Sequence, residues 1–270
     1  MRSSNPVLAS LPAKGQATNY YGDYQQAPTG LDGFAPAPVS TERPMTVDDV
    51  VTKTGIVLAI IVALAAVNFG IALVSPALSM GLTAVGAIGG LVTVLIATFG
   101  KKFGSAPVAL VYAAFEGLFV GGISVLFSGF LVGGNNAGAM IGQAVLGTLG
   151  VFLGMLYAYK TGAVKVTPRF TKILTGAMIG VLVLALGNFM LAILGVSNVL
   201  RDGGPIAIIF SLVCIGLAAM SFLQDFDVAE KLIRQGAPSK LAWGVALGLA
   251  VTLVWLYTEI LRLLSYFSNR

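Results

Sequence analysis

Long apolar stretches separated by short polar connections dominate the chain after residue 50. Each stretch is long enough for a helix of about 20 residues, the length that crosses a hydrocarbon core of about 30 Å. We expect seven membrane-spanning helices, at approximately 54–74, 78–99, 106–131, 138–159, 171–195, 205–224 and 240–265. The pattern therefore predicts an all-α membrane protein whose transmembrane domain covers residues 51–270.

The composition agrees with this assignment, because 57% of the residues are hydrophobic, 10% are charged and the mean hydropathy is +0.91. No soluble domain of this length has such a balance. The chain has no histidine and one cysteine, so the usual metal ligand, the usual catalytic base and a disulfide framework are all excluded. Without a GxSxG turn or a paired-aspartate protease motif, we expect no enzymatic activity and no bound cofactor.

Residues 1–50 are rich in Pro, Ser, Gly, Ala, Tyr and Gln and have no hydrophobic periodicity. Such a composition predicts a disordered tail, here a cytoplasmic one that a membrane protein partner could bind. The first residues contain no apolar core of signal-peptide length, so we expect insertion through the first spanning helix.

Basic residues gather in alternate connections of the predicted helices. Cytoplasmic loops of inserted proteins collect Lys and Arg, so this alternation predicts a cytoplasmic amino terminus and an external carboxyl terminus. The net charge of +5 then marks topology in a lipid bilayer and does not indicate nucleic-acid binding. The basic residues of the tail and the even-numbered connections are Arg2, Lys14, Arg43, Lys53, Lys101, Lys102, Lys160, Lys165, Arg169, Lys172, Lys231, Arg234 and Lys240.

Two acids near the end of the sixth helix have different surroundings along the chain. Asp227 is four residues before Lys231, so a solvated ion pair at helical spacing accounts for it, and Glu230 can pair with Arg234 in the same way. Asp225 has no such partner, and the residues one to three turns before it are small: Ser221, Ala218 and Cys214. We weigh two interpretations of Asp225, a carboxyl group turned toward the bundle beside a crevice and a hydrated acid at the aqueous end of the helix.

Glu116 lies about ten residues, or roughly 15 Å, into the third predicted helix and therefore near the middle of the bilayer. No cation is available on its own helix. An ionised carboxylate there would cost at least a few kcal/mol unless it faces the bundle interior or finds a donor. A functional acid is the default hypothesis for such a residue. The alternative is a neutral glutamic acid hydrogen-bonded to a neighbouring helix for packing.

Glu259 lies toward the external end of the seventh helix, with Arg262 three residues later. A local ion pair beside the aromatic Trp255 is an adequate structural account of both. However, Thr252, Trp255, Glu259 and Arg262 share one face of an otherwise apolar helix, so we expect this face to point inward.

Small and amide residues within the spans predict contacts between helices. Glycines recur in GLTAVGAIGG, EGLFVGGIS and GAMIGQAVLGTLG, where they would let helix backbones approach closely. The amides Asn68, Gln143 and Asn188 are candidates for interior hydrogen bonds.

Several segments together resemble the Bax inhibitor-1 (transmembrane Bax inhibitor motif) family. They are the Glu-Gly pair in helix three, QDFDVAEKL at the end of helix six and LVWLYTEILRLL in helix seven. The MRSSNPV start and the extended tail resemble a bacterial branch of that family, and the resemblance covers essentially the whole chain. It implies a bundle with helix seven at the centre, a bacterial plasma membrane location and a pH-sensitive calcium leak.

The resemblance also implies a site. In characterised relatives an aspartate near the cytoplasmic end of helix six bonds to an aspartate in helix seven, and protonation of the pair changes the gate. The first acid corresponds to Asp225, whereas Thr252 occupies the position of the second. Glu259 follows Thr252 by seven residues, about 10 Å of helix, which is too far for a simple exchange of one acid for the other.

Three possibilities therefore stay open for the gate. Glu116 could supply the second carboxylate, or Asp225 could bond to Thr252 and titrate alone. In relatives a cationic residue of helix two also pairs with the helix six acid and acts as a latch. Lys101 or Lys102 could take this role only if helix two continues to those residues.

The leading functional hypothesis is a calcium leak gated by protonation of interior carboxylates. The gating candidates are Asp225, Glu116, Glu259 and Thr252, and Asp225 and Glu116 are candidate oxygen ligands for the passing Ca²⁺. The alternative is a regulatory or scaffold protein that acts on a membrane protease or a stress response through residues 1–50, without transport. A proton-coupled transporter is a third possibility.

Overall fold

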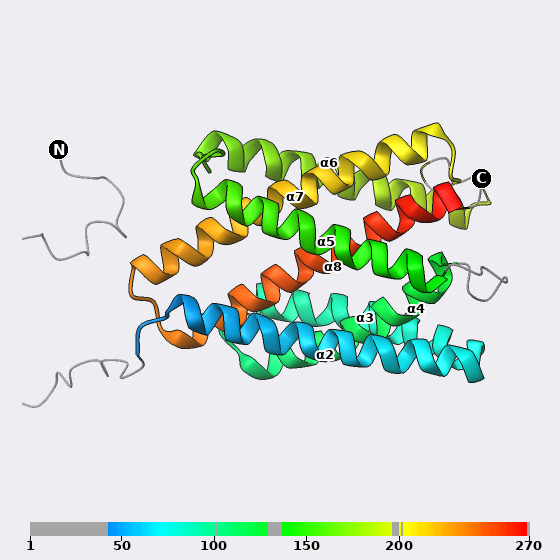
Figure 1. The fold of residues 1–270 in the computed structure, drawn as a ribbon, viewed down its shortest axis with the longest axis horizontal. Coiled ribbons are helices and arrows are strands. Elements are labelled where there is room, and N and C mark those ends of the chain that lie inside the picture. The colour runs from blue at the N-terminus through cyan, green and yellow to red at the C-terminus, as the bar shows by residue number, and fades with distance from the viewer. Residues whose placement is uncertain (1–42, 101, 129–136, 196–199, 201, 269–270) are drawn as a thin grey trace, which may run out of the picture. The chain divides into compact units, whose positions relative to one another are not determined.

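The computed structural model describes residues 43–100, 102–128, 137–195, 200 and 202–268, all within a compact unit that spans 41–270. Each of its seven long helices is long and apolar enough to cross a membrane, which confirms the predicted all-α fold (Figure 1). The helices are α2 (Val47–Val74), α3 (Pro76–Phe99), α4 (Ala106–Phe127), α5 (Ala137–Lys160), α6 (Pro168–Ile193), α7 (Pro205–Arg234) and α8 (Ala242–Ser268). A short 3₁₀ turn, η2 (Ser239–Leu241), precedes α8.

Proline and glycine set several of the helix ends. Pro76, Pro168 and Pro205 each begin a helix, where the missing N–H costs nothing and the fixed φ suits the first turn. Gly236, with φ +65°, ends α7: its N–H donates to the Ile233 carbonyl and the next N–H donates to the carbonyl before that. This is a Schellman motif, which needs a residue in the left-handed region.

The predicted bounds differ from the structure most at the start of the first span, which begins at Val47 and not near 54, and at the end of the sixth span. We predicted that the sixth span ends near 224, but α7 continues to Arg234. The residues after 224 are polar enough to leave the apolar run, yet they form helix well. Ion pairs at i,i+4 spacing, Lys231 with Asp227 and Arg234 with Glu230, support this last part of α7.

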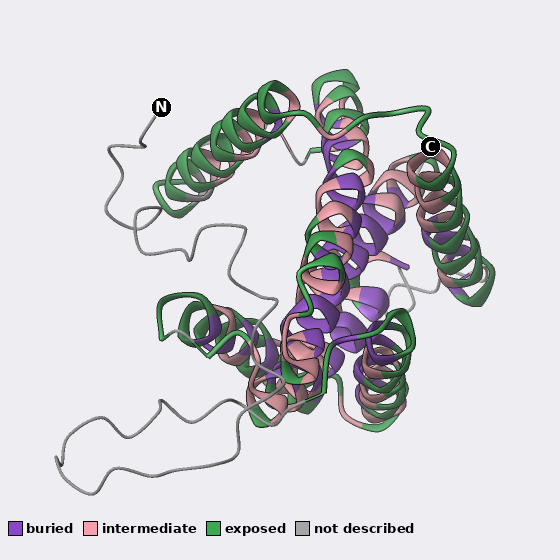
Figure 2. Cartoon of the chain, turned by 90° about the vertical axis from the view of Figure 1, so that its left-hand side faces the viewer, coloured by how far each residue is buried: buried purple, intermediate pink, exposed green. Residues whose placement is uncertain are grey.

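The last helix, α8, lies at the centre of the bundle, as the family resemblance implied. In its most apolar 18-residue window 78% of the residues are buried, against 44% in α7 and 6% in α6. It packs against α2, α4, α5 and α7, whereas α3 packs on α2 and α4 and α6 packs mainly on α7. Figure 2 shows the buried residues gathered in the middle, with exposed faces on the outer helices.

Glycines bring α2, α3 and α4 close together, as predicted for two of the three glycine-rich segments. A Cβ at Gly121 would lie 2.4 Å from the Ala65 carbonyl oxygen of α2, and one at Gly86 would lie 2.6 Å from the Phe115 carbonyl oxygen of α4. The prediction is wrong for most of the α5 segment, where a Cβ at Gly142 would meet nothing within 4 Å. That face of α5 is exposed, because α5 contacts the bundle only along the side toward α7 and α8.

The three amide residues that were candidates for interior hydrogen bonds differ in burial. Asn68 is fully buried on α2, and its Nδ2 donates to the Leu118 carbonyl oxygen at 2.6 Å and to Thr83 Oγ1 at 3.1 Å. Gln143 is exposed on α5, so an interior hydrogen bond is wrong for it. Asn188 is half-buried on α6.

Residues 43–45 run antiparallel to 237–239 and tie the start of α2 to the connection between α7 and α8. The Met45 N–H donates to the Ala237 carbonyl at 2.7 Å, and the Ser239 N–H donates to the Arg43 carbonyl at 3.0 Å. Met45 is only 2% exposed. We placed the tail boundary at residue 50, but residues 43–50 belong to the packed structure; 1–42 lie outside the described residues.

Candidate functional site

Asp225 lies on α7 at a contact with the central helix. Nine residues of α7 follow it, about 14 Å of helix, so it does not stand at the helix end as one of the two interpretations required. Its side chain is partly buried, and Thr252 Oγ1 of α8 donates to its Oδ2 at 2.7 Å. Of the possibilities that the sequence left open, the structure contains the bond between Asp225 and Thr252.

The small residues that precede Asp225 on α7 are buried at helix contacts. Cys214 is 1% exposed and Ala218 is fully buried. Ser221 Oγ donates to the Leu217 carbonyl at 2.9 Å and lies 3.5 Å from the Met178 sulfur of α6. Small side chains therefore let neighbouring helices approach α7 just before the acid.

Asp225 has no ion-pair partner within the part of the chain that the structure describes. The predicted latch required the second helix to continue to Lys101 or Lys102. Instead α3 ends at Phe99, and Lys102 lies in the turn after it with its carbonyl accepting from the Ser105 N–H at 3.0 Å. Gly100 is the C-cap of α3, so the condition for a latch by Lys102 is not met; Lys101 lies outside the described residues.

The acids that follow Asp225 form the predicted exposed pairs. Lys231 pairs with Asp227, and Arg234 pairs with Glu230. The Tyr159 hydroxyl of α5 also donates to the Glu230 carboxylate, a contact that links α5 to α7. These side chains stabilise the end of α7 and lie apart from the contact between Asp225 and the central helix.

Glu259 and Arg262 form a buried ion pair on α8, which confirms that this face points inward. Arg262 Nη1 lies 2.9 Å from Oε1 and 3.0 Å from Oε2 of Glu259. The guanidinium group also lies over the Phe127 ring of α4, 5.5 Å from its centroid. The side chains are 6% and 10% exposed, respectively, so both charges are removed from solvent. Glu259 therefore has a cation partner of its own.

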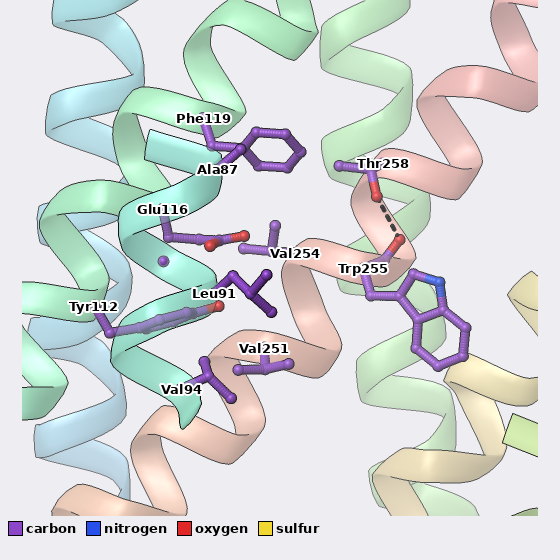
Figure 3. A pocket seen from close by; sticks show the side chains of 11 residues that line it. Ala87, Leu91, Val94, Tyr112, Glu116, Phe119, Val251, Val254, Trp255 and Thr258 are labelled. Atoms are coloured by element: carbon purple, nitrogen blue, oxygen red, sulfur yellow. Dashed lines mark hydrogen bonds between the residues drawn. The ribbon is translucent and has the colours of Figure 1, made fainter. Parts of the chain in front are cut away.

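Glu116 points into a cavity between α3, α4 and α8 (Figure 3). The cavity has a volume of about 350 Å³, and Glu116 is its only charged lining residue. The side chain of Tyr112, one turn earlier on α4, extends toward the same space. The lining residues are Ala87, Gly90, Leu91, Val94, Tyr112, Glu116, Phe119, Val251, Val254, Trp255 and Thr258.

Gly90 makes room for the Glu116 carboxyl group. A Cβ built at Gly90 would lie 2.8 Å from Glu116 Oε2, closer than nonbonded atoms approach. Sequence reasoning found Glu116 from its depth but missed Gly90 as its neighbour. The only indication in the sequence was the glycine-rich segment itself, which predicts close packing without saying which side chain fills the space.

Asp225 and Glu116 do not meet in one site. Thr252 contacts Asp225, whereas the adjacent Val251 lines the cavity of Glu116, so different sides of α8 face the two acids. Among the described residues no three Asp, Glu or Cys side chains gather closely enough to hold a metal ion.

Comparison with protein families gives one relevant finding. The model described as Bax inhibitor 1 like matches residues 5–269, nearly the whole chain. A search of curated proteins gave no match.

Proposed function

Since this chain belongs to the Bax inhibitor 1 like family, we propose that it is a pH-sensitive leak pathway for cations, principally Ca²⁺, in a bacterial plasma membrane. The observation that carries the proposal is the hydrogen bond from Thr252 of the central helix to Asp225 of α7. It joins an acid without an ion-pair partner among the described residues to the helix against which α2, α4, α5 and α7 pack.

The bond gives the contact between α7 and α8 two states. An ionised Asp225 accepts from Thr252 and carries a negative charge at the helix contact. A protonated Asp225 has lost that charge, and its hydrogen bond becomes one between neutral groups. A hydrogen bond to a charged group contributes about 1.5–3 kcal/mol, against about 1 kcal/mol for a neutral one. A change of this size shifts a two-state equilibrium by up to roughly thirtyfold, which would change the measured flux without acting as a complete switch.

Oxygen atoms in the bundle suit a hard cation that must pass and not stay. Ca²⁺ takes six to eight oxygen ligands when it is tightly bound. Conduction instead needs sites that are weak enough to release the ion. Asp225 and Glu116, on different sides of α8, each offer one carboxylate. Such separated acids support transient contacts with a passing cation.

The distribution of basic residues supports a cytoplasmic amino terminus. The described connecting residues 102–105, 161–167 and 235–241 lie at the end of the bundle where α2 begins (Figure 1). Among the described residues these connections and the adjoining helix ends carry most of the Lys and Arg side chains. By the positive-inside rule, this end is cytoplasmic and the carboxyl-terminal end of α8 is external.

The test is calcium flux into vesicles that contain only this protein, measured against pH. We expect Asp225→Asn to change the flux and flatten its pH dependence, because the amide cannot exchange the proton. Asp227→Asn is the matched control, since it removes an acid two residues away whose exposed pair with Lys231 lies outside the helix contact.

Equal behaviour of the two variants would show that Asp225 is not the gating acid. No flux from the unmodified protein at any pH would overturn the leak and favour the regulatory alternative, in which the protein acts through contacts with a partner.

A further inference from the structure

The cavity beside Glu116 has the size and lining of a small-molecule site. Its volume of about 350 Å³ lies within the range of about 300–1,000 Å³ that is typical of ligand pockets. Most of its lining is aliphatic or aromatic, with Leu91 and Val94 from α3, Phe119 from α4 and Val251 from α8. One carboxyl group on a carbon-lined wall is the pattern of a pocket that orients its ligand by a single polar contact.

The lining argues against calcium as the preferred occupant. Apart from the carboxyl group of Glu116, the oxygens of its lining side chains are the hydroxyls of Tyr112 and Thr258. Thr258 already donates to the Trp255 carbonyl at 2.9 Å. These groups fall short of the six to eight oxygens that Ca²⁺ requires, and a carbon-lined wall cannot replace its water shell.

A ligand with one positive charge and an apolar body matches both the charge of Glu116 and the apolar lining of the cavity. A single cationic nitrogen balances the single Glu116 carboxylate, so no second charge is left buried without a partner. The apolar body replaces water against Leu91, Val94 and Val251. The rings of Tyr112 and Phe119 add faces to which a cation is attracted.

We propose that this cavity binds a lipophilic organic monocation, such as an ammonium group bearing an aromatic or branched alkyl substituent, with its nitrogen against the Glu116 carboxylate. The proposal goes beyond the cation leak and does not rest on it.

Two features of the structure keep the carboxylate available to such a ligand. Gly90 leaves the space that Glu116 Oε2 occupies, because a Cβ there would lie 2.8 Å from that oxygen. Leu91 lines the cavity and is also 62% exposed on α3, so the cavity communicates with the outer surface of the bundle. A lipophilic cation that is dissolved in the membrane can therefore enter from the side.

Isothermal titration of the purified full chain in detergent tests the proposal, with benzyltrimethylammonium as the probe. Its charge is permanent, so the result does not depend on the protonation of the ligand. We expect saturable binding of one ligand per chain. Tetramethylammonium keeps the charge without the apolar group, and benzyl alcohol keeps the ring without the charge. Both should bind at least tenfold more weakly, since the first lacks the contact with the apolar lining and the second lacks the contact with the Glu116 carboxylate.

Variants separate the cavity from other surfaces. Glu116→Gln should weaken binding by roughly tenfold or more, the usual contribution of a charged contact of about 1.5–3 kcal/mol. Leu91→Trp should also block binding by filling the cavity from an exposed position, where the larger side chain is tolerated during folding. Glu230→Gln is the matched control, because it removes an acid that pairs with Arg234 at the end of α7. It should leave the affinity unchanged.

Unsaturable uptake that both variants share with the unmodified protein would mean partition into detergent and would overturn the site. Displacement of the probe by equimolar Ca²⁺ would also overturn it, in favour of a divalent-cation site. Because titration measures binding without flux, a failed leak assay leaves this result intact, and the reverse also holds.

Discussion

The ion pair of Glu259 and Arg262 predicts that removing one charge harms the bundle far more than removing both. The two side chains are 6% and 10% exposed, and one guanidinium nitrogen contacts both carboxylate oxygens at 2.9 and 3.0 Å. Arg262→Met keeps a long side chain against Phe127 but takes away the guanidinium group that contacts both carboxylate oxygens of Glu259. Glu259→Gln in the same chain then removes the remaining charge.

The expected magnitude follows from this burial. Breaking a buried pair by removing one partner costs about 3–5 kcal/mol, whereas replacing both partners with uncharged residues is often neutral or stabilising. For a protein of about 150–250 residues, 1 kcal/mol corresponds to roughly 2–4 °C in the unfolding midpoint. Arg262→Met should therefore lower the midpoint by roughly 6–20 °C, and the double variant should recover most of that loss.

The assay is thermal unfolding of the purified protein in one detergent, followed by tryptophan fluorescence. Lys231→Met is the control, since it breaks an ion pair whose lysine is 63% exposed and which should contribute no more than about 1 kcal/mol. The reasoning is refuted if Arg262→Met costs no more than Lys231→Met. The single variant Glu259→Gln is measured as well. The reasoning is also refuted if the midpoint of the double variant falls by the sum of the decreases in the two single variants.

Two further predictions concern glycines and use the same unfolding assay. Gly121→Ala should destabilise the protein by about 1–3 kcal/mol, because its Cβ would lie 2.4 Å from the Ala65 carbonyl oxygen and α2 and α4 must separate. Gly142→Ala, where the Cβ meets nothing within 4 Å, should instead be neutral or stabilising by up to about 1 kcal/mol; the same loss in both would contradict close helix packing as the cause. Gly236→Ala should cost about 1–2 kcal/mol, since φ is +65° there, and an unchanged midpoint would show that the end of α7 rearranges freely.

Sequence patterns predicted the contact partner of Asp225 only as one of several possibilities. Thr252 was placed opposite Asp225 through the family resemblance, and the structure confirms the bond at 2.7 Å. The sixth span was predicted to end at 224 because the apolar run ends there, although the i,i+4 spacing of the charged residues after it already indicated that the helix continues. The i,i+4 pairs in that segment were predicted correctly, since both partners lie on one helix.

Contacts between distant helices were the least predictable part. Gly90 and Glu116 are 26 positions apart, and Met45 and Ala237 are separated by most of the chain, so no local pattern links either pair. The glycines of α3, α4 and α5 are alike in the sequence, but Gly86 of α3 and Gly117 and Gly121 of α4 lie against a neighbouring backbone, whereas Gly142 of α5 meets nothing within 4 Å.

The sequence by itself determined the seven spans, the class of the fold and the ion pairs within single helices. The reason is that the length of an apolar run and the spacing of residues along a helix are local properties, and the bilayer imposes the same length on every span. The tertiary structure alone decided that Asp225 contacts the central helix, that Glu116 faces a cavity and that residues 43–45 pair with 237–239. These depend on which faces of the helices pack together, and in lipid that choice follows from the fit of small residues and hydrogen bonds across several helices at once.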